Sequence, residues 1–185
     1  YSCAPHSSNP AGGAYPMLHV TELNELGELD ALRPVWRGLL LQTANYSFLQ
    51  TLEWLEATWS HYRLPQKLRV MLVERDGTPL GIVPLCVRTE RRKFGAFRVL
   101  TYPLDDWGTF YGPVGGEPGV AFRAAMEHVA ATRRDWDFID LRWVDQAAPE
   151  FLAVGESLRQ CGFSCLVRPR MEVRLVRMHE GWDAY

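Results

Sequence analysis

Acidic and aromatic side chains are concentrated in residues 104–119, LDDWGTFYGPVGGEPG, the segment whose residue types are best suited to chemistry. Its first half holds Asp105, Asp106, Trp107 and Tyr111. Carboxylates bind hydroxyl or ammonium groups and aromatic rings cover the apolar face of a sugar, so this combination predicts a site for an amine or sugar-linked acceptor. The alternative is structural: the aspartates cap a turn, and the two rings pack beneath it.

The second half of this segment is the glycine-rich stretch GPVGGEPG, residues 112–119, just before a predicted helix. Backbone N–H groups at a helix N-terminus can cradle phosphates. Charge argues against that role, because no Lys or Arg lies between Arg98 and Arg123, whereas three acids do. Like charges about 4 Å apart cost roughly 1 kcal/mol in water and about 4 kcal/mol near a protein surface. The sequence therefore favours a surface loop that leads into a helix.

Arg142 and Trp143 end the predicted strand FIDLRWV, residues 138–144. An arginine beside a tryptophan could clamp a carboxylate or a phosphate. Because strand faces alternate, the competing interpretation is an outward Arg142 and a buried Trp143. We include Arg142 among the candidate substrate-binding residues.

The remaining reactive residues form no catalytic or metal-binding pattern. The five histidines are widely separated and show neither H-x-x-x-H nor H-E-x-x-H spacing, so no metal site is predicted and no catalytic base is assigned. The four cysteines are too scattered for a disulfide scaffold. The basic stretch RTERRK, residues 88–93, is interrupted by Glu90 and predicts a solvated hairpin end, not a nucleic-acid partner.

Composition places the chain among ordinary globular proteins. Its 185 residues are 47% apolar and 23% charged, with a net charge of −2, which excludes the disordered, fibrous and small disulfide-rich classes. No apolar run approaches the roughly 18 residues of a membrane span, and we expect a cytoplasmic location.

The elements that must position these residues follow from hydrophobic periodicity. Period-two runs predict strands, and apolar residues at three- and four-residue steps predict helices. The Asp76-Gly77 pair predicts a tight hairpin. The expected strands are 18–23, 68–75, 80–88, 97–103, 137–144, 163–168 and 171–177, and the expected helices are 28–42, 51–62, 118–134 and 148–161. This order, β-α-α-β-β-β-α-β-α-β-β, predicts a mixed α/β fold in which helices flank a mixed sheet.

Residues 1–16 are rich in Pro, Gly and Ser and predict a flexible leader. Residues 17–178 contain no linker and predict one domain. We expect residues 179–185 to begin a connection to further chain, because the sequence stops at GWDAY without a polar tail.

The expected element order matches that of the GNAT acyltransferase fold. The amino-acid sequence resembles the amino-terminal half of the bacterial FemAB-like and CelD-like GNAT N-acetyltransferases. In that group an F-x-T/S-x-x-W-L stretch precedes a strand pair of the form V-x-x-D-G-x-x-x-G-x-x-P-L. The matching residues here are Phe48, Thr51, Trp54, Leu55, Asp76, Gly77, Gly81, Pro84 and Leu85. The likeness spans about residues 18–185 and rests on apolar and turn positions.

The resemblance implies two GNAT-like halves, of which this chain would be the amino-terminal, acceptor-side half. The missing carboxyl half would carry the acyl donor, acetyl-CoA or another acyl-CoA (an acyl-tRNA in the Fem branch), so no cofactor is expected in this chain and the isolated chain is expected to be inactive. An apolar surface over residues 163–177, Trp182 and Tyr185 should then lie exposed. The second hypothesis is a non-catalytic module that binds a cell-wall or polysaccharide precursor.

Overall fold

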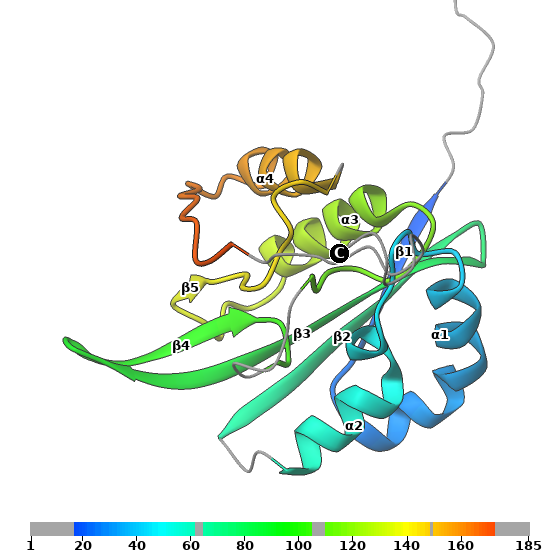
Figure 1. The fold of residues 1–185 in the computed structure, drawn as a ribbon, viewed down its shortest axis with the longest axis horizontal. Coiled ribbons are helices and arrows are strands. Elements are labelled where there is room, and N and C mark those ends of the chain that lie inside the picture. Colours follow the sequence, from blue (N-terminus) through cyan, green and yellow to red (C-terminus); the bar gives the residue numbers. More distant parts are fainter. Residues whose placement is uncertain (1–16, 62–64, 105–109, 149, 173–185) are drawn as a thin grey trace, which may run out of the picture.

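The computed structural model describes residues 17–61, 65–104, 110–148 and 150–172 (Figure 1). Its strands are β1 (Leu18–Leu23), β2 (Gln66–Arg75), β3 (Thr78–Arg92), β4 (Gly95–Thr101) and β5 (Phe138–Ile139). Its helices are α1 (Arg33–Leu40), α2 (Leu52–His61), α3 (Pro118–Ala131) and α4 (Glu150–Gln160), with short 3₁₀ helices η1 (Leu26–Leu32) and η2 (Phe48–Gln50).

The five strands form one mixed sheet in the order β1-β2-β3-β4-β5. Neighbours from β1 to β4 are antiparallel, whereas β5 pairs parallel to β4 through Val99–Phe138 and Leu100–Ile139. Both residues of the β2–β3 turn, Asp76 and Gly77, have positive φ, as the expected two-residue hairpin requires. The predicted mixed α/β fold is confirmed.

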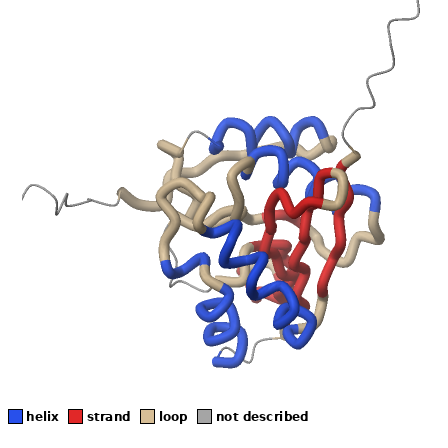
Figure 2. The backbone as a smooth tube through the Cα atoms, turned by 90° about the vertical axis from the view of Figure 1, so that its right-hand side faces the viewer, coloured by secondary structure: helices blue, strands red, loops and turns tan. Residues whose placement is uncertain are grey.

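Helices cover both faces of the sheet, with α1 and α2 on one side and α3 and α4 on the other (Figures 1 and 2). Alternate residues of β2 divide between two apolar cores: Val70 and Leu72 pack toward α1 and α2, and Met71 and Val73 lie in the core beneath α3. Because both faces of β2 are buried, its residues 70–73 form a continuous apolar run.

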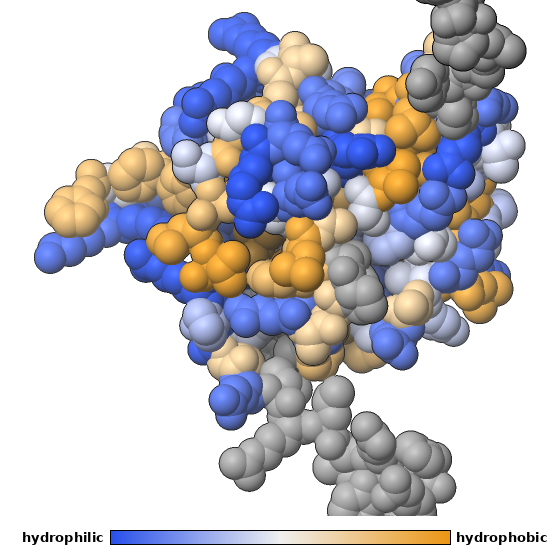
Figure 3. Space-filling view, turned by 90° about the horizontal axis from the view of Figure 1, so that it is seen from above, coloured by the Kyte–Doolittle hydropathy of each residue, from blue (hydrophilic) through white to orange (hydrophobic). Residues whose placement is uncertain are grey.

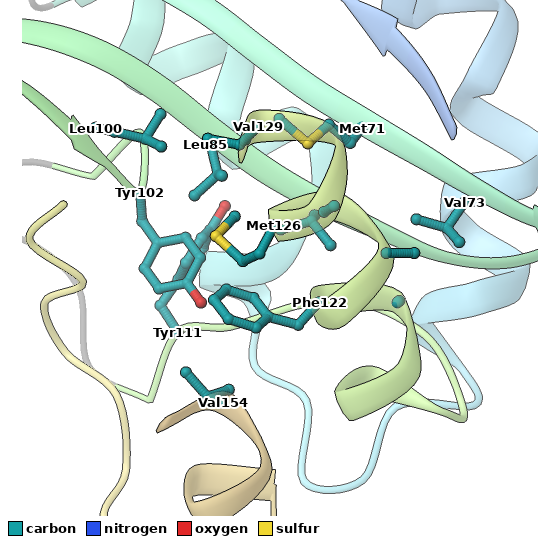
Figure 4. Packing of buried hydrophobic residues seen from close by; sticks show 14 of the residues in the cluster. Met71, Val73, Leu85, Leu100, Tyr102, Tyr111, Phe122, Met126, Val129 and Val154 are labelled. Atoms are coloured by element: carbon teal, nitrogen blue, oxygen red, sulfur yellow. The ribbon is translucent and has the colours of Figure 1, made fainter. Parts of the chain in front are cut away.

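Helix α3 lays Phe122, Met126 and Val129 into the second core (Figure 4). Ala130, next to Val129, lies on the solvent side of the helix. Pro34 lies in the first turn of α1, where its missing N–H has no helical partner to lose, and the preceding residues form the separate helix η1.

Pro84 occupies a local edge of β3. It faces Val70 of β2 on one side. On the other side, the strand contacts Val114 through Ile82 and meets β4 only from Cys86 onward. Within the part of the chain that the structure describes, no strand faces Pro84 there, so its missing N–H costs no ladder bond.

The predicted strands in the last third are largely wrong. The expected strand 137–144 shortens to the two residues of β5, because Trp143 adopts a left-handed backbone with φ of 64° and breaks the extended run. Residues 163–168 form no strand. Residues 171 and 172 are not in a strand, and the rest of the expected 171–177 strand lies outside the described residues.

Candidate functional site

The carboxyl ends of the parallel strands β4 and β5 define the candidate site, since ligands of open α/β sheets bind beyond the carboxyl ends of their strands. Tyr102 and Leu104 follow β4, and Asp140 to Trp143 follow β5. Of the predicted site residues, Tyr111 and Arg142 are brought to this edge. Asp105, Asp106 and Trp107 lie outside the described residues, so their role stays a prediction.

Tyr111 is a core residue. Its side chain is 2% exposed, and its ring packs edge-on against Tyr102 with centroids 5.2 Å apart. Figure 4 shows both rings beneath α3, beside Phe122 and Met126. Burial raises the pKa of the Tyr111 hydroxyl well above its usual value, so the group stays protonated. Of the two interpretations of Tyr111, a binding residue or a ring packed beneath the loop, its burial favours the packed ring.

Two bulky residues at this edge have left-handed backbones, a feature that the sequence did not reveal. Phe110 has φ of 55° and Trp143 has φ of 64°. They are joined through the Tyr111 N–H, which donates to the Trp143 carbonyl over 2.9 Å. Such conformations cost about 1–3 kcal/mol each and are found mainly at functional sites.

Residues 110–114 bridge the opening between β3 and the segment that follows β5. At one end the Tyr111 N–H bonds to Trp143, and at the other Val114 exchanges two 2.8 Å backbone hydrogen bonds with Ile82 of β3. The returning chain thereby links the carbonyl of Trp143 to β3.

Arg142 lies in an ion network and not on an open surface. Its guanidinium donates to Glu90 over 2.6 Å and to Asp140 over 2.9 Å, and Arg92 donates to the same two acids over 3.0 and 2.9 Å. Burial alone would raise the pKa of Glu90 and of Asp140, but the arginine hydrogen bonds outweigh it and hold both pKa values below their usual range. Both acids are therefore ionised and occupied at neutral pH.

The network also anchors the start of the acidic segment. Arg88, buried in β3, lies 3.4 Å from Glu90 and donates to the Leu104 carbonyl over 3.1 Å. Leu104 directly precedes Asp105. Arg142 is thus linked to the Leu104 carbonyl through Glu90 and Arg88.

A second ion network, which the sequence analysis missed, crosses the other edge of the sheet. Arg69 of β2 donates twice to Glu22 of β1, each time over 2.7 Å, and His128 of α3 lies 3.0 Å from the same carboxylate. Burial alone would raise the pKa of Glu22, but Arg69 and His128 together lower it. The available signal was an arginine inside the apolar run LRVMLV, which demands a buried partner.

The carboxylates of Glu22, Glu90 and Asp140 should make the fold less stable at acidic pH. The pKa values of Glu22, Glu90 and Asp140 all lie below the usual values for their side chains, because arginine hydrogen bonds stabilise the ionised forms. A carboxyl whose folded-state pKa is depressed stabilises the fold above its unfolded-state pKa and loses that contribution as pH falls through the folded-state value. We expect the melting temperature to change little between about pH 7 and about pH 5 and to fall steeply below about pH 4.5, measured by circular dichroism.

The matched variants are Arg142→Met and, on exposed α3 surface, Arg123→Met. Arg142→Met should reduce the fall in melting temperature at acidic pH, because Glu90 and Asp140 lose a partner. Arg123→Met should leave this fall unchanged. A melting temperature that rose on acidification would contradict the assignment.

The glycine-rich stretch is used for close packing. Gly115 has φ of 141°, and a Cβ there would lie 2.5 Å from the Leu80 carbonyl oxygen. Its N–H donates to the Thr43 hydroxyl over 2.8 Å. At the N-cap of α3, Glu117 accepts two hydrogen bonds from Arg75, over 2.7 and 2.8 Å. The Glu117 carboxylate makes no capping hydrogen bond to α3, but it adds a negative charge beside the helix N-terminus, where a phosphate would bind.

A small cavity of about 60 Å³ lies between α1 and α2, on the face opposite α3. Its polar lining includes Arg33, Arg37, Glu53 and Thr51, with Trp36 among the apolar residues. This volume is well below the roughly 300 Å³ at which small-molecule pockets begin, so the cavity is too small for a sugar ring. Arg33 is already paired with Asp30, Glu53 and Glu56.

Within the described ranges, no group of three or more His, Cys, Asp or Glu side chains is arranged to hold a metal ion. Among the same residues, no helix has the length and apolar character needed to cross a membrane.

Comparison with known proteins gives structural likenesses alone. No protein-family model matches the sequence, and no curated protein matches it. Among solved structures, a ribosomal-protein-alanine N-acetyltransferase from Brucella melitensis biovar Abortus 2308 is similar to this chain with 12% identity and a TM-score of 0.47, over 85% of this chain and 99% of that one.

Aminoglycoside N-acetyltransferase AAC(6')-Iy, in complex with CoA, is similar with 14% identity and a TM-score of 0.47, over 90% of this chain and 98% of that one. An aminoglycoside acetyltransferase from an uncultured soil metagenomic sample, in complex with trehalose, is similar with 11% identity and a TM-score of 0.41, over 85% of this chain and 97% of that one.

Proposed function

We propose that this chain is the acceptor-side unit of a GNAT-type N-acyltransferase and works with an acyl-CoA site formed outside it. The observation that carries the proposal is the parallel β4–α3–β5 unit, reached in the element order expected for that fold. An acidic residue, Glu117, stands at the N-cap of its helix α3 and is paired with Arg75. The fold thus has the form of an acyltransferase, while its helix end disfavours phosphate binding.

The motif residues behind the family resemblance support the fold part of this proposal. Asp76 and Gly77 form the β2–β3 turn, Pro84 lies at the local edge of β3, and Leu55 is buried in the core beneath α1 and α2. Gly81 passes so close to α3 that a Cβ there would lie 2.7 Å from the Ala121 Cβ. Each position has a structural role, so the motif specifies how the helices and sheet are joined.

The reaction would transfer an acyl group from a thioester to an amine. The amine nitrogen attacks the thioester carbonyl, the carbon–sulfur bond breaks, and an amide and a thiol are released once the amine has lost a proton to a base. In the described part of the site, Glu90 and Asp140 are both held by arginines, which makes them poor bases. Asp105, Asp106 and Trp107 are the proposed acceptor residues, positioned by Arg142 through the anchor at Leu104.

Isothermal titration calorimetry of this chain with acetyl-CoA tests whether the acyl donor binds outside it. We expect no measurable heat, because the segment from residue 99 to residue 122 carries three acids and no base and its helix N-cap is ion-paired. Micromolar binding that is lost on Gly116→Val would overturn the proposal that the acyl donor binds elsewhere.

Release of free thiol from acetyl-CoA tests the reaction itself, measured with amino-sugar acceptors and the longest polypeptide that the gene encodes. Asp105→Asn with Asp106→Asn should raise the Michaelis constant for the amine more than that for acetyl-CoA. Saturable binding of the acceptor without any thiol release would instead favour the second candidate, a non-catalytic module that binds a cell-wall or polysaccharide precursor. The absence of both would refute both candidates.

A further inference from the structure

The β3–β4 hairpin projects beyond the rest of the sheet (Figure 1). Pairing of β3 with β2 ends at Arg88, whereas its pairing with β4 continues from Thr89–Arg98 to Arg92–Gly95. Residues 91–94, here called the hairpin tip, lie at its far end. Phe94 is 86% exposed there, which is the reverse of what the hydrophobic effect favours for an unassociated aromatic side chain.

The hairpin tip is also basic. Arg91 and Lys93 are exposed, and the Lys93 ammonium lies 5.6 Å from the centroid of the Phe94 ring. Arg92 is already shared between Glu90 and Asp140, the acids nearest the tip among the described residues. Since those acids are neutralised by Arg92 and Arg142, the charges of Arg91 and Lys93 face outward without local compensation.

A second segment with the same character lies at this end of the molecule. In residues 166–171, Leu166 is 75% exposed, Val167 and Met171 are more than half exposed, and Arg168 is exposed. The Arg170 guanidinium lies 4.8 Å from the centroid of the Trp143 ring, and the neighbouring Arg142 bonds to Glu90 of the hairpin. Glu172, which follows, is the one described acid in residues 163–172.

Figure 3 shows the consequence on the surface: apolar and hydrophilic side chains lie next to each other at the end from which the hairpin projects. Large apolar side chains among cations fit the boundary of an anionic lipid bilayer, where rings and aliphatic groups enter the headgroup region and cations meet phosphate or carboxylate. Single-stranded nucleic acid is a poorer fit, because it favours a groove with successive aromatic platforms, and the hairpin tip offers a single ring.

We propose that the hairpin tip and residues 166–171 together form a docking surface for an anionic lipid bilayer. Phe94, Leu166, Val167 and Met171 enter the interface, and Arg91, Lys93 and Arg168 contact the headgroups. The whole chain carries a net charge of −2, so attraction comes from this end alone. Binding should therefore weaken as salt screens the local charges.

Co-sedimentation of the chain with vesicles tests the proposal, using phosphatidylcholine alone and phosphatidylcholine mixed with phosphatidylserine. We expect binding to the mixed vesicles only. Phe94→Ala should weaken it about tenfold or more, because the variant loses a large buried apolar side chain. Arg91→Gln and Lys93→Gln should each weaken it about fivefold. The matched controls are Leu41→Ala and Arg123→Gln, at exposed positions away from this end of the chain's described surface, and they should bind as the parent does.

Circular dichroism melting should show that Phe94→Ala folds normally, as expected for an exposed position. The proposal is overturned if the parent does not bind the mixed vesicles, or if Phe94→Ala binds them as tightly as the parent. It is equally overturned if the same residues instead govern the binding of a fluorescent oligonucleotide or the self-association of the chain in sedimentation velocity, with no effect on vesicle binding.

Discussion

Replacing Arg69 with methionine should lower the free energy of unfolding by about 3–5 kcal/mol. The Arg69 side chain is 3% exposed and holds both oxygens of Glu22. Its loss leaves the carboxylate partly buried with His128 as its remaining ionisable partner. Removal of one member of a buried ion pair leaves an uncompensated charge, which costs far more than the net contribution of the intact pair.

Urea denaturation followed by fluorescence would measure this loss. The control is Arg37→Met, because Arg37 is 74% exposed and lies 3.8 Å from Glu53; it should change stability by less than about 0.5 kcal/mol. Adding Glu22→Leu to Arg69→Met should restore much of the loss, since an apolar pair needs no charge partner. If Arg69→Met costs less than about 1 kcal/mol, water reaches this carboxylate and the network is not a buried one.

The first two-thirds of the fold could be predicted because its signals are local. The apolar spacing of Trp36, Leu39 and Leu40 defines the buried face of α1, and the Asp76-Gly77 pair defines the β2–β3 turn. Period and turn chemistry operate within a few residues, so they can be read without knowing the partners of each segment.

The rest depends on contacts between distant segments. The left-handed backbone of Trp143 ends β5 early, and its supporting hydrogen bond comes from Tyr111. The charge of Arg69 inside an apolar run is explained only by its partner Glu22, which lies 47 residues earlier in the chain. The burial of Tyr111 likewise follows from residues 110–114 bridging to β3, which no local pattern indicates.

The candidate site divides in the same way. The sequence predicts Arg142 as a candidate at the end of a strand 138–144, whereas the strand ends at Ile139 and Arg142 lies in the segment that follows it, at the carboxyl edge of the parallel pair. Its partner Glu90 lies in the hairpin, 52 residues earlier in the chain, and Arg92 of the same hairpin binds Asp140, the other acid that Arg142 contacts. That Arg142 is already paired with Glu90 and Asp140 could be learned only from the three-dimensional arrangement.

The glycine-rich stretch gives the second large prediction, because a packing role and a ligand-binding role predict different outcomes. Gly115→Ala should lower the free energy of unfolding by about 3 kcal/mol. The new methyl group would meet the Leu80 carbonyl oxygen at 2.5 Å, and φ of 141° is strained for any residue with a Cβ. The backbone of β3 cannot yield easily, since Ile82 nearby is fixed by its bridge to Val114.

Gly116→Ala is the matched control. Gly116 is exposed, and a Cβ there would find its nearest neighbour, the Gln42 amide oxygen, at an ordinary 3.5 Å. If the stretch serves packing, urea denaturation should show a large loss for Gly115→Ala and almost none for Gly116→Ala, and neither variant should alter the heat measured with acetyl-CoA. If the stretch cradled a phosphate, Gly116→Ala would weaken acetyl-CoA binding at unchanged stability, because an added methyl would keep the ligand away from the backbone N–H groups. The ion pair between Glu117 and Arg75 at the same helix end favours the first outcome.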